Sequence, residues 1–233
     1  MSDFEAPDSL AQPFQRVRSQ IELACQQAQR QPDSVALLAV SKKHPSAKIK
    51  QLHALGQNSF GENYVQEGVE KVQELSNLGI EWHFIGPIQS NKSRLVSEHF
   101  QWVHTLDSEK LARRLNEQRP EHMGPLNVLI QVNISEQSSK SGLHVTEVTD
   151  FAKTVSKMPN LKLRGLMCIP APLDEAPLKA DFSKMHQAFV ELQKNYPQVD
   201  TLSMGMSGDL SSAIECGSTM VRIGSALFGQ RPS

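Results

Sequence analysis

The sequence predicts an α/β fold, a (β/α)8 TIM barrel formed by one domain over residues 1–233, with an extra helix at its N-terminus. Three observations support this prediction. Strand-like and helix-like segments alternate along nearly the whole chain. Several strand-like segments are continuous apolar runs, as expected for strands buried on both faces of a parallel sheet. The length of 233 residues suffices for one such barrel and leaves no room for a large second domain.

Eight segments have the pattern of strands, and amphipathic segments lie between them. The predicted strands are Val35–Ser41, Ser59–Glu62, Trp82–Gly86, Trp102–Leu106, Asn127–Asn133, Leu163–Ile169, Thr201–Met206 and Met220–Phe228. The predicted helices are the extra one, Ser9–Gln29, followed by Ala47–Leu55, Val65–Leu78, Lys92–Phe100, Ser108–Gln118, Val145–Met158, Asp181–Tyr196 and Asp209–Gly217. Start and stop signals agree: Pro45 and Ser108 open two helices, and Gly56 and Gly217 close two.

A doubly wound open sheet is the alternative fold. It is disfavoured because no Gly-x-Gly-x-x-Gly sequence follows the first strand. Residues 170–178 are rich in proline, and we expect them to form a loop after the sixth strand, either a surface excursion or a lid. We expect residues 1–8 to be disordered.

Composition excludes several classes of protein. The net charge of -1 gives no basic surface of the kind that binds nucleic acid. No apolar stretch approaches the ~18 residues of a membrane span, and the acidic N-terminus lacks the features of a secretory signal. Cys25, Cys168 and Cys216 are widely spaced, and the histidines show no metal-ligand spacing. We therefore expect a cytoplasmic protein with no nucleic-acid partner, no membrane partner and no metal.

Lys42 is the first candidate functional residue, because it ends the first predicted strand. Active sites in this fold lie at the C-terminal ends of the strands. Burying an ammonium is costly, and burial favours the neutral amine, which forms Schiff bases with carbonyl compounds such as pyridoxal phosphate. The alternative is that Lys42 is simply the first solvated residue after the strand.

The ends of the last two predicted strands resemble a phosphate site. In these barrels phosphate is commonly bound by the loops after strands seven and eight and a nearby helix N-terminus. Ser207 precedes a predicted helix, Gly224 lets the backbone approach a ligand, and Ser225 adds a hydroxyl donor. Alternatively, Ser207 only caps the helix and Gly224 only permits close packing.

Arg222 lies inside the last predicted strand, where a fixed cation needs an acceptor. A structural ion pair is the common explanation for such an arginine. The functional explanation is that its guanidinium donates to an aromatic nitrogen or a phosphate. These features predict a site for pyridoxal 5'-phosphate, because they bring together a lysine amine, phosphate-binding loops and an arginine at the C-terminal end of the barrel.

Short motifs distributed between about residue 10 and residue 230 strengthen this interpretation. They are Ala39-Val-Ser-Lys42, Phe60-Gly-Glu-Asn-Tyr-Val-Gln-Glu67, Trp82-His-Phe-Ile-Gly-Pro87, Gln89-Ser-Asn-Lys92, Lys140-Ser-Gly142, Arg164-Gly-Leu-Met167, Leu202-Ser-Met-Gly-Met-Ser207 and Val221-Arg-Ile-Gly224. In these motifs the chain closely resembles the pyridoxal phosphate homeostasis protein family. The resemblance implies a single barrel related to the N-terminal domain of bacterial alanine racemase, which binds pyridoxal phosphate and has no established catalytic turnover.

The resemblance also implies a role for each candidate residue. Lys42 would be the Schiff-base lysine; Ser207, Gly224 and Ser225 would hold the phosphate; Arg222 would face the pyridine nitrogen; Asn63 and His83 would lie beside the ring; and Met206 would belong to the same site. For His83, a hydrogen-bonded packing role is the alternative. Glu62 and Glu67 are expected to be solvated or structurally paired rather than catalytic.

Two functions from different classes fit this site. The first is a carrier that binds, buffers or delivers pyridoxal phosphate inside the cell, as a monomer, with pyridoxal-phosphate-dependent apoenzymes as partners. The second is a racemase-like enzyme with weak activity. An arginine at the ring nitrogen weakens the electron sink, and a racemase also needs a second acid/base group. Neither Tyr64 nor Tyr196 is an evident replacement for that group, so we expect a carrier with no catalytic residues.

Overall fold

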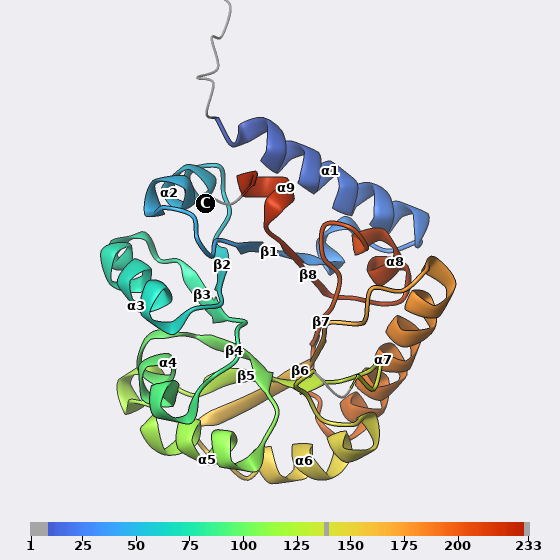
Figure 1. Cartoon of the computed structure of the whole chain (residues 1–233). Coiled ribbons are helices and arrows are strands. Elements are labelled where there is room, and N and C mark those ends of the chain that lie inside the picture. The colour runs from blue at the N-terminus through green and yellow to red at the C-terminus, as the bar shows by residue number, and fades with distance from the viewer. Residues whose placement is uncertain (1–8, 138–139, 231–233) are drawn as a thin grey trace, which may run out of the picture.

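The computed structural model describes residues 9–137 and 140–230, and within these ranges eight parallel strands form one closed barrel in chain order. Figure 1 shows the ring of strands with helices around it. The strands are β1 (Ala36–Val40), β2 (Ser59–Glu62), β3 (Glu81–Phe84), β4 (Trp102–Leu106), β5 (Leu126–Val132), β6 (Leu161–Cys168), β7 (Thr201–Ser203) and β8 (Met220–Ile223). The predicted fold is confirmed, and the expectation for residues 1–8 lies outside the described ranges.

Helices connect the strands and cover the outside of the barrel. They are α1 (Ala11–Gln27), α2 (Ser46–Ala54), α3 (Val65–Glu74), α4 (Ser93–His99), α5 (Glu109–Gln118), α6 (Val148–Val155), α7 (Glu175–Asn195), α8 (Leu210–Glu215) and α9 (Ser225–Phe228). The extra helix α1 buries Phe14, Val17 and Ile21 and packs against α8 and α9 (Figure 1). Its apolar stripe at helical spacing explains why it docks there.

Alternation along each strand divides the core into two layers. Outward-facing residues such as Ala39, Phe60 and Phe84 pack with the helices. Inward-facing residues include an apolar group around Leu38 and Val40. A second apolar group in the interior consists of Trp102, Leu129 and Met167. The interior is therefore a packed core with polar residues between its apolar groups.

Several predicted boundaries were wrong by two residues or more, and three of them have a local reason. The eighth strand stops at Ile223, because Gly224 (φ -115°, ψ -79°) leaves the extended conformation and begins α9. The seventh stops at Ser203, and Gly205 (φ +98°) then redirects the chain. Helix α7 begins at Glu175, so part of the predicted loop 170–178 is helical. Pro177 is tolerated there because first-turn N–H groups have no intrahelical partner.

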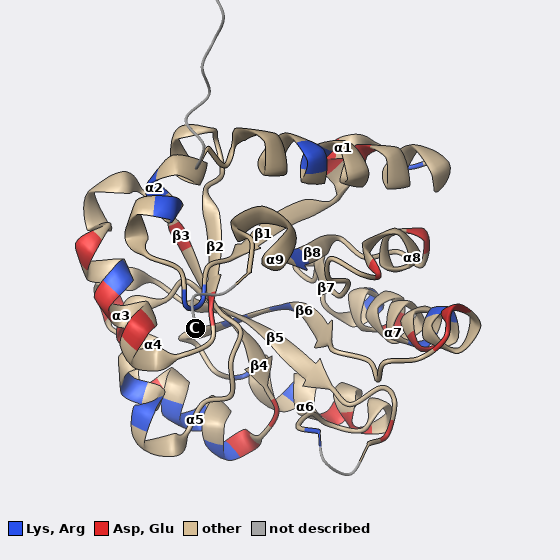
Figure 2. Ribbon diagram, turned by 45° about the horizontal axis from the view of Figure 1, so that its top comes forward, with Lys and Arg blue, Asp and Glu red and all other residues tan. Residues whose placement is uncertain are grey.

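Charged residues are found mainly on the outer helices (Figure 2). Across the described ranges no helix has the length and apolar character needed to cross a membrane. The same residues contain no group of three or more His, Cys, Asp or Glu side chains arranged to hold a metal ion.

Candidate pyridoxal phosphate site

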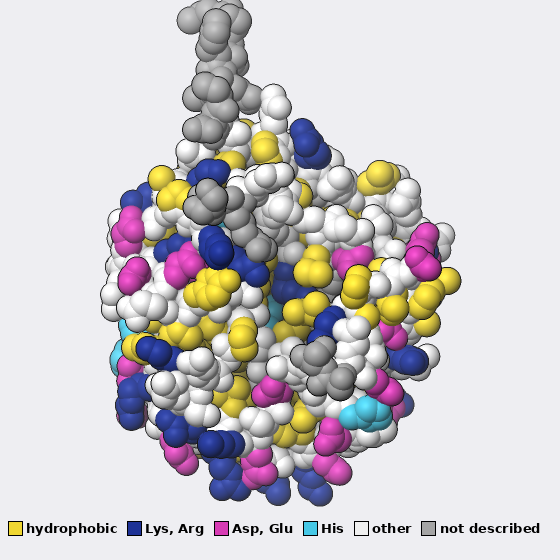
Figure 3. Space-filling model, in the orientation of Figure 1, with side chains coloured by type: hydrophobic (Ala, Val, Ile, Leu, Met, Phe, Trp, Pro, Cys, Tyr) yellow, Lys and Arg dark blue, Asp and Glu magenta, His cyan; other side chains and the backbone are white. Residues whose placement is uncertain are grey.

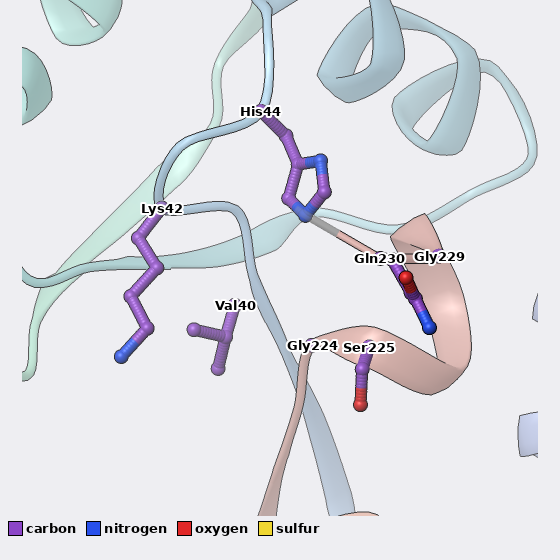
Figure 4. Close-up of a pocket in the computed structure, with 7 residues that line it drawn as sticks. All are labelled: Val40, Lys42, His44, Gly224, Ser225, Gly229 and Gln230. Atoms are coloured by element: carbon purple, nitrogen blue, oxygen red, sulfur yellow. The ribbon is translucent and has the colours of Figure 1, made fainter. Parts of the chain in front are cut away.

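A cavity of about 340 Å³ lies where β1 and β8 end. Figure 3 shows the molecule hollowed near the centre of this face, with hydrophobic and basic side chains around the hollow. The cavity contains three of the predicted site residues, Lys42, Gly224 and Ser225. Its complete lining is Val40, Lys42, His44, Gly224, Ser225, Gly229 and Gln230 (Figure 4).

Barrel closure brings Lys42 to Gly224 and Ser225. Strands β1 and β8 pair in parallel, with Ala39 opposite Ile223, so the segments that follow both strands emerge side by side. Figure 4 shows the side chains of Lys42 and Ser225 extending in the same direction past Val40. A Cβ on Gly224 would lie 3.4 Å from the carbonyl oxygen of Val40, an ordinary contact distance, so a close approach that only glycine allows is not needed at this position.

Arg222 is buried inside the barrel and bonded to neutral acceptors. Its Nη1 donates to the carbonyl and hydroxyl oxygens of Ser203, each over 2.8 Å, and its Nη2 donates to the carbonyl oxygen of Cys168 over 2.9 Å. Burial lowers the pKa of the guanidinium, but an arginine keeps its proton in proteins. These bonds use three of its five N–H groups, so others remain to face a ligand.

His83 takes part in a hydrogen-bonded chain that ends at Arg222. Ser203 Oγ lies 3.1 Å from His104 Nδ1, and His104 Nε2 lies 2.9 Å from His83 Nδ1. His83 Nε2 lies 3.1 Å from Glu81 Oε2. The Glu81 carboxylate can only accept, so with neutral rings each histidine carries its proton on Nε2, and the Ser203 hydroxyl accepts from Arg222 and donates to His104. Burial lowers the pKa of both histidines, which agrees with two neutral rings.

The other predicted residues lie at the same end of the barrel but outside this cavity. Ser207 is exposed and lines a neighbouring cavity of about 180 Å³ beside α1 and α8. Met206 is 40% exposed on the same segment. Asn63 follows β2, and its Oδ1 is buried without a hydrogen-bond partner among the described residues. The structure thus groups Lys42 with the β8 residues and leaves Ser207 adjacent.

Sequence reasoning missed two residues that line the cavity, His44 and Gln230. His44 stacks on Phe228 with ring centroids 4.9 Å apart. The position of His44, two residues after Lys42, could have indicated that it lies at the site. No sequence feature indicated this for Gln230. Lys140, the other lysine in a family motif, donates to the carbonyl oxygens of Ile169 and Pro170.

Comparison with known proteins identifies the family. Residues 14–232 match the family model for the N-terminal domain of alanine racemase. A pyridoxal phosphate homeostasis protein of Pasteurella multocida is 54% identical over 228 residues, which cover 96% of this chain and 98% of that protein. This chain belongs to the pyridoxal phosphate homeostasis protein family. The family member of Haemophilus influenzae is 56% identical over 220 residues, 92% of this chain and 93% of that protein.

Solved structures agree with this membership. PipY of Synechococcus elongatus, with pyridoxal phosphate (PLP) bound, is 38% identical; the match covers 94% of this chain and 100% of PipY, with a TM-score of 0.81. An alanine racemase of E. faecalis is 18% identical; the match covers 97% of this chain and 59% of the racemase, with a TM-score of 0.71. The racemase likeness shows the shared barrel fold alone.

Proposed function

We propose that this protein binds pyridoxal phosphate at Lys42 and takes part in its intracellular homeostasis by holding and releasing the cofactor, without catalytic turnover. The observation that carries the proposal is the cavity that joins Lys42 to Gly224 and Ser225, next to the strand that contains Arg222. The PLP-bound structure of PipY supports the same ligand.

The residues at this site fit the chemical groups of the cofactor. Its aldehyde condenses with the Lys42 amine to form a Schiff base and release one water. The backbone N–H groups and hydroxyl at Gly224 and Ser225 suit a phosphate, with Ser207 as a further donor from the adjacent segment. Arg222 supplies N–H donors for the pyridine nitrogen. The cavity volume of about 340 Å³ lies in the range of small-molecule sites.

Asn63, His83 and Met206 complete the proposed site. The buried Oδ1 of Asn63, which lacks a hydrogen-bond partner among the described residues, has capacity to accept a hydrogen bond from a ligand. Both ring nitrogens of His83 are bonded to protein groups, so this residue would contact the cofactor through its ring rather than as a base. Met206 would cover the ring from its exposed segment.

Two features support a carrier rather than an enzyme. The Arg222 guanidinium is held by neutral acceptors, so its positive charge disfavours a proton on the pyridine nitrogen and weakens the electron sink that amino-acid chemistry uses. Tyr196 directly follows α7 and precedes β7, which places it at the opposite end of the barrel from Lys42. Tyr64 is 49% exposed, and neither tyrosine is an evident second acid/base group for a racemase. We accordingly propose a cytoplasmic monomer that supplies the cofactor to apoenzymes.

Reduction with borohydride tests the assignment of Lys42. The protein incubated with pyridoxal phosphate is expected to be yellow, and reduction followed by peptide mapping should place the cofactor on Lys42. The Lys42→Ala variant should lose the Schiff-base absorption. Labelling mainly at Lys140 or Lys43 would contradict the assignment.

A further inference from the structure

The turn that carries Lys42 is anchored by a buried cluster of charged side chains, the α3 clamp, which consists of Glu62, Glu67 and Lys71. Lys71 is 6% exposed and its Nζ donates to the carbonyl oxygen of Ser41 (2.8 Å), to Glu62 Oε1 (2.7 Å) and to Glu67 Oε1 (2.6 Å). Ser41 Oγ donates to the same Glu62 oxygen over 2.6 Å. Buried charges are stable only with such pairing, so the clamp has a defined arrangement.

Both peptide groups that flank Lys42 are bonded to the α3 clamp. The carbonyl group of Ser41 belongs to the peptide before Lys42 and accepts from Lys71. The N–H group of Lys43 belongs to the peptide after Lys42 and donates to Glu67 Oε1 over 2.6 Å. Because the backbone is held on each side, the Cα position of Lys42 and the direction of its side chain are fixed relative to α3.

The backbone at Lys43 requires this support. Its φ is +62°, in the left-handed region that residues with a Cβ adopt at a cost of roughly 1–2 kcal/mol. Such a conformation persists where the surrounding contacts enforce it, and it clusters at binding and catalytic sites. The bond from Lys43 N–H to Glu67 is the contact that enforces it here.

Helix α3 reaches the turn because Gly68 allows it to lie close to β2. A Cβ on Gly68 would lie 2.7 Å from Phe100 Cζ and 3.2 Å from Glu62 Cβ. Glu67 and Lys71 are four residues apart on the helix, so their head groups meet on one face. The close packing of α3 therefore delivers both groups to the Lys42 turn.

We propose that Lys71 and Glu67 are positioning residues for Lys42, which hold its amine where the aldehyde of bound pyridoxal phosphate can react. This inference rests on the proposed function. It assigns Lys71 and Glu67 to a step of that function, the condensation of amine and aldehyde with loss of one water. The residues proposed to hold the phosphate follow β7 and β8, and none of them is bonded to Lys71 or Glu67, so binding of the phosphate is not expected to depend on these two side chains.

Binding of two ligands can distinguish a role of Lys71 and Glu67 in positioning Lys42 from a role in stabilising the fold. Pyridoxal phosphate forms the Schiff base, whereas 4'-deoxypyridoxine 5'-phosphate has the same phosphate and ring but no aldehyde. The Lys71→Met and Glu67→Ala variants are expected to bind pyridoxal phosphate about tenfold more weakly, because a small displacement of a reacting group costs that order of rate or affinity. Their affinity for the deoxy analogue, measured by calorimetry, should stay within twofold of the original protein.

Three further variants complete the experiment. Lys50→Met removes an exposed ion pair between α2 and α3, with Glu74, and should change neither affinity. Lys71→Arg keeps the charge and should restore part of the Schiff-base absorption. Lys42→Ala tests the proposed function itself: if it binds pyridoxal phosphate as the original protein does, that function is wrong irrespective of the clamp.

The outcomes that overturn the positioning role are distinct. Unchanged affinity for both ligands in Glu67→Ala would overturn it. An equal loss for both ligands would show that the clamp only stabilises the fold. Glu67 is 27% exposed in its side chain, so Glu67→Ala leaves a folded protein for measurement even where the buried Lys71→Met does not.

Discussion

Gly86 lies against the backbone of Asn63, at the ends of two adjacent strands. A Cβ on Gly86 would lie 2.1 Å from the Asn63 carbonyl oxygen and 2.7 Å from its Cα. The carbonyl oxygen of Gly86 also accepts a hydrogen bond from Thr105 Oγ1 over 2.7 Å, so Gly86 cannot shift outward without cost. This glycine in the Trp82-His-Phe-Ile-Gly-Pro87 motif therefore sets the position of a proposed ligand residue.

The variant Gly86→Ala should lower the free energy of unfolding by about 1–3 kcal/mol, the usual cost of steric overlap in a packed interior. Urea unfolding measures this. The matched control is Gly208→Ala, where no atom lies within 4 Å of the added Cβ and no positive φ is required. The control should stay within about 0.5 kcal/mol of the original protein. Equal effects of the two substitutions would refute the steric argument.

At the scale of elements, strands β3, β4, β7 and β8 share the hydrogen-bonded chain from Glu81 to Arg222 inside the barrel. Its polarity is fixed by the Glu81 carboxylate, which can only accept, so His83 Nε2 donates to it. Protonating His83 would place its Nδ1–H group against the Nε2–H group of His104. The folded protein therefore holds His83 and His104 neutral, and their pKa values lie below the ordinary value because of burial.

The buried neutral histidines predict that the free energy of unfolding decreases in acid. Burial lowers the pKa of both histidines in the folded protein, so below about pH 6.5 the unfolded chain binds more protons at these two residues than the folded one, and stability falls as pH falls. Each such histidine contributes at most about 1.4 kcal/mol per pH unit. The hydrogen bond from His83 lowers the pKa of Glu81 from 4.5 to about 2, so its contribution is present above pH 4.5 and lost below it.

Urea unfolding between pH 7.5 and pH 5.5 checks the prediction. Burial raises the pKa of Glu62, which opposes the effect, so slopes are compared between variants. His104→Asn should reduce the pH slope of the unfolding free energy, whereas His122→Asn, at an exposed position, should leave it unchanged. A His104→Asn slope equal to that of the original protein would show that the chain does not hold neutral histidines.

At the scale of the whole molecule, the alternation of apolar runs and amphipathic segments was sufficient to predict the barrel. Barrel closure then followed, and with it the meeting of Lys42 and Gly224, because the first and last strands must pair. The ends of β7 and β8 were not predictable, since they depend on the backbone conformation at Gly205 and Gly224. Propensity along the chain does not contain that information.

Two further features of the site could not be predicted from the sequence. Lys71 and Glu67 have the composition of a solvated helix face, and their burial depends on how closely α3 packs at Gly68. The pairing of His83 with His104 requires the register of β3 against β4, which no short motif encodes. Glu62 and Glu67 were expected to be either solvated or structurally paired, and their ion pairs with Lys71 show the second alternative.

In the proposed function, Lys42 holds pyridoxal phosphate for other proteins and does not use it in turnover. The direct test mixes the loaded protein with a pyridoxal-phosphate-dependent apoenzyme and follows reactivation of that enzyme, while a parallel sample is assayed for interconversion of L- and D-alanine. We expect the loaded protein to reactivate the apoenzyme, the Lys42→Ala variant to fail to do so, and neither protein to racemise alanine. Sustained racemisation over many turnovers, removed by Lys42→Ala, would contradict it.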